Sequence, residues 1–148
     1  YGIIPVVAAH FLGVFAPGAM GTILANPQAL IFLESVGLGL GLFALFGCLV
    51  LLARRLNTPI LKPVTSASDW VLLFLLIFQT ATGVYMGLFM RWGSQWYLHT
   101  AVPYLYSLLV FNPQVEYVSD FPLVFKLHAS GAFLIVALLP FTKLVHLL

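Results

Sequence analysis

The sequence predicts an all-α fold: an integral membrane helical bundle with about four transmembrane helices and one interfacial segment. Of its 148 residues, 62% are hydrophobic and only 7% are charged, and the mean hydropathy is +1.09. A soluble domain carries about 25% charged residues, so this chain has too little polar surface to cover a globule in water. Apolar runs of about 20 residues, the length that crosses a bilayer, occur several times. We therefore expect a multi-pass protein of the cell inner (cytoplasmic) membrane, in contact with lipid.

Composition excludes several other classes of protein. Six basic and four acidic residues give a net charge of +2, and no basic cluster is dense enough to predict nucleic acid as a partner. Cys48 is the only cysteine. An internal disulfide, a cysteine-ligated iron–sulfur cluster and a c-type haem attachment are therefore excluded.

The first apolar segment runs from Tyr1 to about Ala16, and Pro17-Gly18 ends it. It is short for a full span, and the chain opens with neither methionine nor a signal peptide. We expect residues 1–148 to be a single transmembrane domain truncated at its N-terminus. Gly21–Pro27 is predicted to be a loop.

Sequence signals at their ends mark the remaining spans. Arg54-Arg55 terminates the second span, and Ser66-x-x-Asp69 is a capping box that begins the third. Basic residues gathered in the loop after the second span predict that this loop is cytoplasmic. The three predicted spans are Gln28–Ala53, Asp69–Met90 and Ser119–Leu148.

The region Arg91–Asp120 is aromatic and amphipathic, and Pro103 and Pro113 interrupt it. We interpret it as interfacial or re-entrant, with the tryptophans and tyrosine of residues 92–97 forming an interface belt. Pro140 is expected to kink the last span.

Histidines inside the spans are the informative residues, because ionisable groups in a membrane are rare and usually functional. His10 and His128 each lie about seven or eight residues from the outer end of their segments, or roughly 10–12 Å deep. Two imidazoles at one depth on different helices suit bis-histidine ligation of haem b iron. The alternative is that each histidine only forms an interhelical hydrogen bond.

His146 follows His128 by 18 residues, which is about 27 Å along a straight helix. It therefore cannot share an iron with His128. It would serve a second, inner haem near the cytoplasmic face, with a partner at or before Tyr1.

The motifs Lys126–His128 and Leu139–His146 resemble the gamma subunit of respiratory membrane-bound nitrate reductase, a dihaem cytochrome b with five spans in most members. Further similarities cover nearly the whole chain: His10-Phe11-x-Gly13, Arg54-Arg55-Leu56, Asp69, and Gln79 with Gly83. The resemblance implies that His10 and His128 ligate the outer haem and that His146 ligates the inner haem. It places the fourth ligand one position before Tyr1. It also implies two partners on the cytoplasmic side, an iron–sulfur subunit and a molybdenum-containing catalytic subunit.

Glu34 lies about six residues into the second span, near the depth of the outer histidines. We expect it to accept a proton from quinol, since an apolar setting makes a carboxylate a usable base near neutral pH. It could instead hydrogen-bond a neighbouring helix or face a watery crevice. Some family members have a lysine near the quinol site, but Gln28–Leu33 contains none.

Arg54 and Arg55 lie at the cytoplasmic end of the second span, where guanidinium groups could pair with inner-haem propionates. The simpler interpretation is that they only set the topology. The predicted function is a membrane cytochrome b that oxidises quinol and passes electrons through haem b to the iron–sulfur partner of a nitrate-reductase-like complex. Two alternatives stay open: a haem-free membrane anchor or small transporter, and the equivalent cytochrome of a complex with another terminal substrate, such as a sulfur compound.

Overall fold

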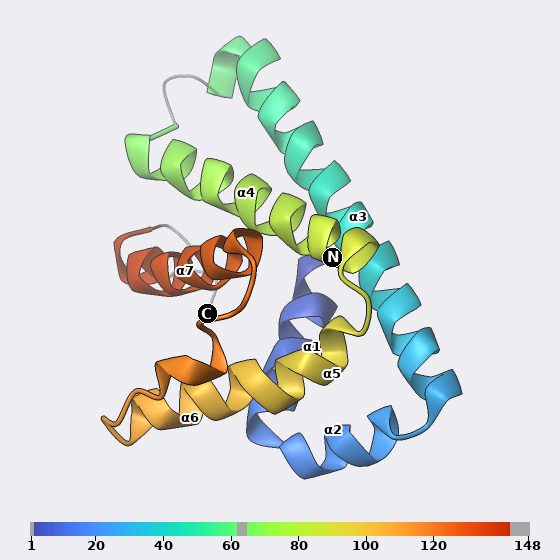
Figure 1. Cartoon of the computed structure of the whole chain (residues 1–148). Helices are drawn as coiled ribbons and strands as arrows, with labels where there is room; N and C mark the ends of the chain where they lie inside the picture. The colour runs from blue at the N-terminus through green and yellow to red at the C-terminus, as the bar shows by residue number, and fades with distance from the viewer. Residues whose placement is uncertain (1, 62–64, 143–148) are drawn as a thin grey trace.

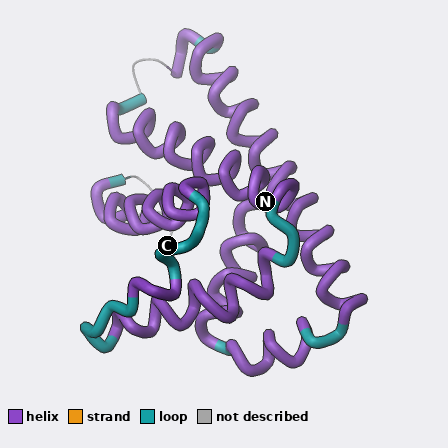
Figure 2. The backbone as a smooth tube through the Cα atoms, in the orientation of Figure 1, coloured by secondary structure: helices purple, strands orange, loops and turns teal. Residues whose placement is uncertain are grey.

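The computed structural model describes residues 2–61 and 65–142, and every regular element in those ranges is a helix (Figure 2). Two helices, α1 (Ile3–Phe15) and α2 (Pro17–Leu24), meet at 107° and form either one broken span or a re-entrant loop. In the described residues, three further stretches are long and apolar enough to cross a membrane: α3 (Pro27–Asn57), α4 (Ala67–Phe89) and Leu123–Phe141. The predicted all-α membrane fold is therefore confirmed.

The break between α1 and α2 lies at Ala16, whose backbone leaves helical geometry at φ −134° and ψ 56°. Pro17 then takes the first position of α2. Proline suits this position because the missing N–H would have no partner there and its φ angle is already helical. The predicted end of the first segment at Pro17-Gly18 is confirmed.

The loop predicted for Gly21–Pro27 is wrong over its first half, because α2 continues to Leu24. The Leu24 side chain is 2% exposed and packs with Leu30 of α3 and Leu98. The Cβ position of Gly21 lies 3.6 Å from the Leu98 Cδ2 atom, at ordinary van der Waals distance. Tertiary burial thus overrides the weak helix propensity of a glycine-containing stretch.

Helix α3 begins at an asparagine cap. The Asn26 side chain accepts hydrogen bonds from the backbone N–H groups of Gln28 and Ala29, which satisfies two donors that the first helical turn leaves free. At the other end, Arg54 and Arg55 lie within the last turn rather than after it. Their positive charges are favourable there because of the helix dipole.

The predicted capping box begins α4. The Ser66 hydroxyl accepts from the Asp69 backbone N–H, and Asp69 Oδ2 accepts from the Ser66 N–H at 2.9 Å. Helix α4 lies between α3 and α7 (Leu123–Leu138), and it packs against both (Figure 1). Small residues allow this packing, since Cβ atoms at Gly41 and Gly87 would lie 3.3 Å from Val84 and 3.2 Å from Leu38.

Three short helical pieces follow one another after α4: α5 (Gly93–Trp96), a π-helical turn η2 (Tyr97–Ala101) and α6 (Val102–Leu109). The backbone enters them through Trp92, whose φ of 64° makes a left-handed turn. These pieces contact α1 and α2 at one end of the bundle (Figure 1). None of them is long enough to be counted as a span, as predicted for this region.

The remaining helical elements of the described chain are short 3-10 turns joined by loops. η1 (Pro59–Leu61) follows α3, η3 (Val115–Tyr117) lies between α6 and α7, and η4 (Leu139–Phe141) continues α7. The α-helix ends at Leu138, two residues before Pro140, and continues as a 3-10 turn, whereas the kink expected at Pro140 stays a prediction. Proline has no N–H to donate and crowds the preceding turn, which disfavours α-helix there.

The burial of Leu24 yields a test of the α2 packing. We expect Leu24→Ala to destabilise the protein by about 2–5 kcal/mol, because it removes a buried side chain and leaves a cavity. Ile23→Ala is the matched control, since Ile23 is 44% exposed. Unfolding in detergent micelles measures both variants, and equal losses of stability would contradict the packing described.

Candidate functional site

His10 lies on α1 with its ring held by its own helix. Its Nδ1 atom is 2.8 Å from the carbonyl oxygen of Val6. A carbonyl only accepts, so Nδ1 carries the proton and donates it, and Nε2 keeps a free lone pair. The ring is exposed, which leaves that lone pair accessible to a ligand.

Tyr97 of η2 fixes the backbone around His10. Its hydroxyl donates to the His10 carbonyl oxygen at 3.0 Å, and its ring meets the imidazole edge-on with centroids 5.3 Å apart. The ring lies directly over Gly13, where a Cβ atom would come within 2.7 Å of Tyr97 Cε1. Burial raises the pKa of Tyr97 to about 12, so its hydroxyl stays a hydrogen-bond donor throughout the physiological pH range.

His128 lies on α7 and is held by α4. Its Nε2 atom is 3.0 Å from Gln79 Nε2, and its Nδ1 atom is 2.9 Å from Thr82 Oγ1. Two glycines make room for these contacts. A Cβ atom at Gly83 would lie 3.2 Å from His128 Cε1, and one at Gly131 would lie 2.6 Å from Gln79 Oε1.

His10 and His128 lie on two helices that pack mainly on elements other than each other. Helix α1 packs on α2, α3 and η2, whereas α7 packs on α4. In the described part of the chain, no three histidine, cysteine or acidic side chains converge as a metal-binding group. Haem iron needs only two axial nitrogens, because the porphyrin supplies the others. A pair of imidazoles on helices that are not tightly packed together fits that requirement.

The predicted ligand His146 lies outside the described residues. Arg54 and Arg55 lie in the last turn of α3. Within residues 2–61 and 65–142, the Nη1 atom of Arg55 is buried with no hydrogen-bond partner. Such a donor is costly to bury, which makes Arg55 a candidate for binding an anionic group.

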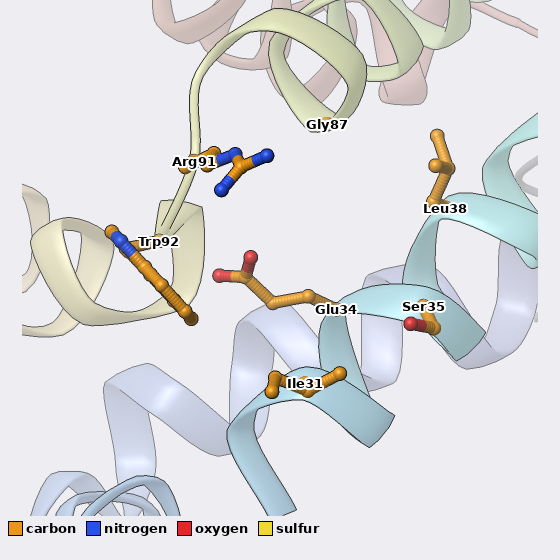
Figure 3. A pocket seen from close by; sticks show the side chains of 7 residues that line it. All are labelled: Ile31, Glu34, Ser35, Leu38, Gly87, Arg91 and Trp92. Atoms are coloured by element: carbon orange, nitrogen blue, oxygen red, sulfur yellow. The ribbon is translucent and has the colours of Figure 1, made fainter. Parts of the chain in front are cut away.

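Glu34 lines a pocket of about 300 Å³ between α3 and the α4–α5 connection. Its Oε1 atom accepts a hydrogen bond from the Ser94 backbone N–H at 2.9 Å. Figure 3 shows the guanidinium group of Arg91 pointing toward the Glu34 carboxylate, with the Trp92 ring beside them. The pocket is completed by Ile31, Ser35, Leu38 and Gly87. The carboxylate therefore bonds a residue of a neighbouring helix and also lines a pocket, and its role as a proton acceptor stays a prediction.

Several residues of these sites were not predicted from the sequence. Nothing in the sequence indicates that Thr82 contacts His128, because a threonine within an apolar span commonly bonds the backbone of its own helix. Arg91 and Trp92 follow the third predicted span at the membrane face where Glu34 is expected. This shared face is the sequence feature that could have placed them near Glu34. Tyr97 was assigned to the interface belt, whereas its ring packs inward over α1.

A sequence profile of the family described as nitrate reductase gamma subunit matches residues 1–148. The chain belongs to the nitrate reductase gamma subunit family. Membership confirms the resemblance inferred from the histidine motifs, and it makes the chain a membrane protein of an oxidoreductase family.

Individual proteins similar to this gamma-family chain support the same family assignment. The nitrate reductase gamma chain of Bacillus subtilis is 30% identical over 150 residues, which are 99% of this chain and 67% of the relative. The respiratory nitrate reductase 1 gamma chain of Escherichia coli is 27% identical over 99% of this chain and 66% of its own length. The nitrate reductase-like protein NarX of Mycobacterium tuberculosis is 24% identical, with 23% of its length covered. The chain thus spans about two thirds of the two gamma chains and less than a quarter of NarX.

The contact of Tyr97 with Gly13 yields a second test. Gly13→Ala should destabilise the protein by about 1–3 kcal/mol, because the added methyl group overlaps a ring that is held in place. In an ordinary helix the same change stabilises by up to about 1 kcal/mol.

Gly47→Ala is the control, since its Cβ position on α3 meets no atom within 4 Å. Thermal unfolding in detergent compares the two variants. A melting temperature that rises equally in both would show that Tyr97 does not press on α1.

Proposed function

We propose that this chain is the membrane cytochrome b subunit of a nitrate-reductase-like complex. In this role it oxidises quinol and delivers the electrons through haem b to an iron–sulfur partner subunit. The observation that carries the proposal is the pair His10 and His128: two imidazoles on different helices, each held by a hydrogen bond at Nδ1. Family membership supports the same role.

His10 and His128 are the residues that would hold the outer haem. Haem b, when bound, supplies a one-electron acceptor and donor. The two imidazoles contribute neutral Nε2 lone pairs, and their Nδ1 contacts hold each ring in one orientation. Ligands whose outer hydrogen bonds are satisfied in this way bind metal more strongly and in a defined geometry.

The Glu34 pocket is our proposed quinol site. Gly87, which lines it, lies four residues beyond Gly83, which touches the His128 ring. The pocket is therefore only about one helical turn, or roughly 6 Å, further along α4. Quinol oxidation releases two electrons and two protons, and Glu34 would accept one proton. The Ser94 N–H would hold the carboxylate toward the pocket, and Arg91 would stabilise negative charge on the substrate oxygen.

The inner haem would be held by His146, as the family resemblance implies. Arg54 and Arg55 would pair with its propionates, and the unpartnered Nη1 atom of Arg55 supports this. The iron–sulfur subunit and the molybdenum-containing catalytic subunit would bind on the cytoplasmic side, where the basic end of α3 is predicted to lie.

Two alternative functions, a haem-free membrane protein and a cytochrome of another complex, would give different experimental results. A haem-free anchor or small transporter would give no haem signal in a reduced-minus-oxidised visible spectrum, whereas bis-histidine haem gives a sharp α band. A cytochrome serving a sulfur-compound complex would give the band but would co-purify with a different catalytic subunit. Affinity purification from native membranes followed by identification of the subunits distinguishes these cases.

Replacing a ligand tests the haem assignment directly. We expect His128→Leu and His10→Leu each to abolish the α band of the outer haem in purified protein. His99→Leu is the control, since His99 is exposed on η2 and belongs to no proposed site. If the band survives loss of either proposed ligand, the haem is held elsewhere.

Glu34→Gln tests the proton acceptor. The amide oxygen can still accept from the Ser94 N–H, so the pocket keeps its shape, but the side chain no longer binds a proton. We expect the rate of quinol oxidation to fall by about 10²-fold or more with an unchanged haem spectrum.

Glu116→Gln is the control, since it removes an exposed carboxylate on η3 that does not line the pocket, and it should retain the rate. Wild-type turnover in Glu34→Gln would remove Glu34 from the mechanism.

A further inference from the structure

We propose that Thr82 is a positioning residue for His128. Its hydroxyl oxygen accepts the hydrogen bond from His128 Nδ1–H, which sets the tautomer of the imidazole and strengthens Nε2 as a donor to the outer haem iron. This inference rests on the proposed function, because it concerns the same ligand. It adds a residue outside the motifs that predicted the histidines.

Counting hydrogens around Thr82 gives the direction of the bond. Its Oγ1 atom lies 2.8 Å from the carbonyl oxygen of Phe78 and 3.1 Å from that of Gln79. Both are acceptors only, and the hydroxyl has one hydrogen to donate. That hydrogen points back to the helix backbone, so the lone pair of Oγ1 faces His128 Nδ1 at 2.9 Å. The proton between them must therefore sit on Nδ1.

The contact between Gln79 and the opposite nitrogen of the His128 ring requires the same tautomer of His128. Its Nε2 amide group is a donor and lies 3.0 Å from His128 Nε2, which must then carry the lone pair. In the described part of the chain the amide oxygen Oε1 is buried without a hydrogen-bond partner. An iron bound at Nε2 would take the place of the Gln79 N–H on the same lone pair.

The two proposed ligands differ in what receives their Nδ1 proton. His10 donates to the Val6 carbonyl, a backbone group that substitution does not remove. His128 donates to a side-chain hydroxyl on a different helix. Thr82 is therefore the position where a mutation changes the hydrogen bonding of one ligand and leaves the other unchanged.

The expected effect on the haem has a definite sign. A hydrogen bond at Nδ1 raises the basicity of a ligating imidazole, and a stronger donor stabilises ferric over ferrous iron. Loss of the bond should therefore raise the midpoint potential of the outer haem. It should also weaken haem retention, because the ring loses a restraint on its orientation.

Thr82→Val is the test variant, since valine keeps the shape of threonine and removes the oxygen. Redox titration of the purified complex should show the ferrous-to-ferric ratio of the outer haem at a fixed potential rising by up to about tenfold, which corresponds to about 59 mV for one electron. The low-spin ferric signal in electron paramagnetic resonance should shift as well. Thr82→Ser restores the hydroxyl and should return both properties to wild type.

Thr80→Val is the matched control. The Thr80 hydroxyl bonds the carbonyl oxygens of Leu76 and Ile77 on its own helix in the same way, and its other partner is Cys48 rather than a histidine. This variant should leave potential and signal unchanged. If Thr82→Val loses haem, retention of haem by Thr82→Ser and Thr80→Val still supports the proposal.

The outcomes separate this inference from the proposed function. A wild-type complex without an α band would overturn the proposed function. A normal band in Thr82→Val with an unshifted potential, or equal shifts in Thr82→Val and Thr80→Val, would overturn only the role of Thr82.

Discussion

The hydrogen-bonded contact between α4 and α7 at His128 is the interaction on which the proposed site depends. In a lipid bilayer, buried polar groups have no water to bond and must find partners within the protein. The hydrogen-bond partners of His128 are two side chains of α4, Gln79 and Thr82. Gly83 and Gly131 let the two helices approach closely enough for these bonds to form. The same contact thus packs two spans together and orients one imidazole.

The segment between the third and fourth spans holds the two histidine-bearing helices together. Two tyrosine hydroxyls bond the backbone of α1: Tyr97 bonds the His10 carbonyl at 3.0 Å, and Tyr106 bonds the Val14 carbonyl at 2.6 Å. On the other side, the Trp96 ring meets Phe125 of α7 edge-on at 5.4 Å. The Val14 carbonyl lies in the last turn of α1, where carbonyls lack intrahelical partners. Tyr106 satisfies that carbonyl while Trp96 of the same segment contacts α7.

The same segment also completes the Glu34 pocket. The left-handed turn at Trp92 ends α4 and begins α5, which brings Arg91 and the Ser94 N–H toward the carboxylate. An interfacial stretch that does not cross the membrane therefore contributes to both proposed sites. This arrangement accounts for its aromatic composition better than lipid contact alone, because Trp96 and Tyr97 are used for internal packing.

The amino-acid sequence by itself determined the membrane fold, the helix ends at Pro17, Asn57 and Ser66 to within a few residues, and the family through its histidine motifs. These features depend on apolar length, capping residues and spacing, which are local properties of the chain. Only the tertiary structure decided that residues 17–24 form a helix, that Thr82 faces His128, and that Arg91 points toward Glu34. Each of these depends on which residues of distant segments meet, and hydropathy and periodicity along one segment carry no information about that.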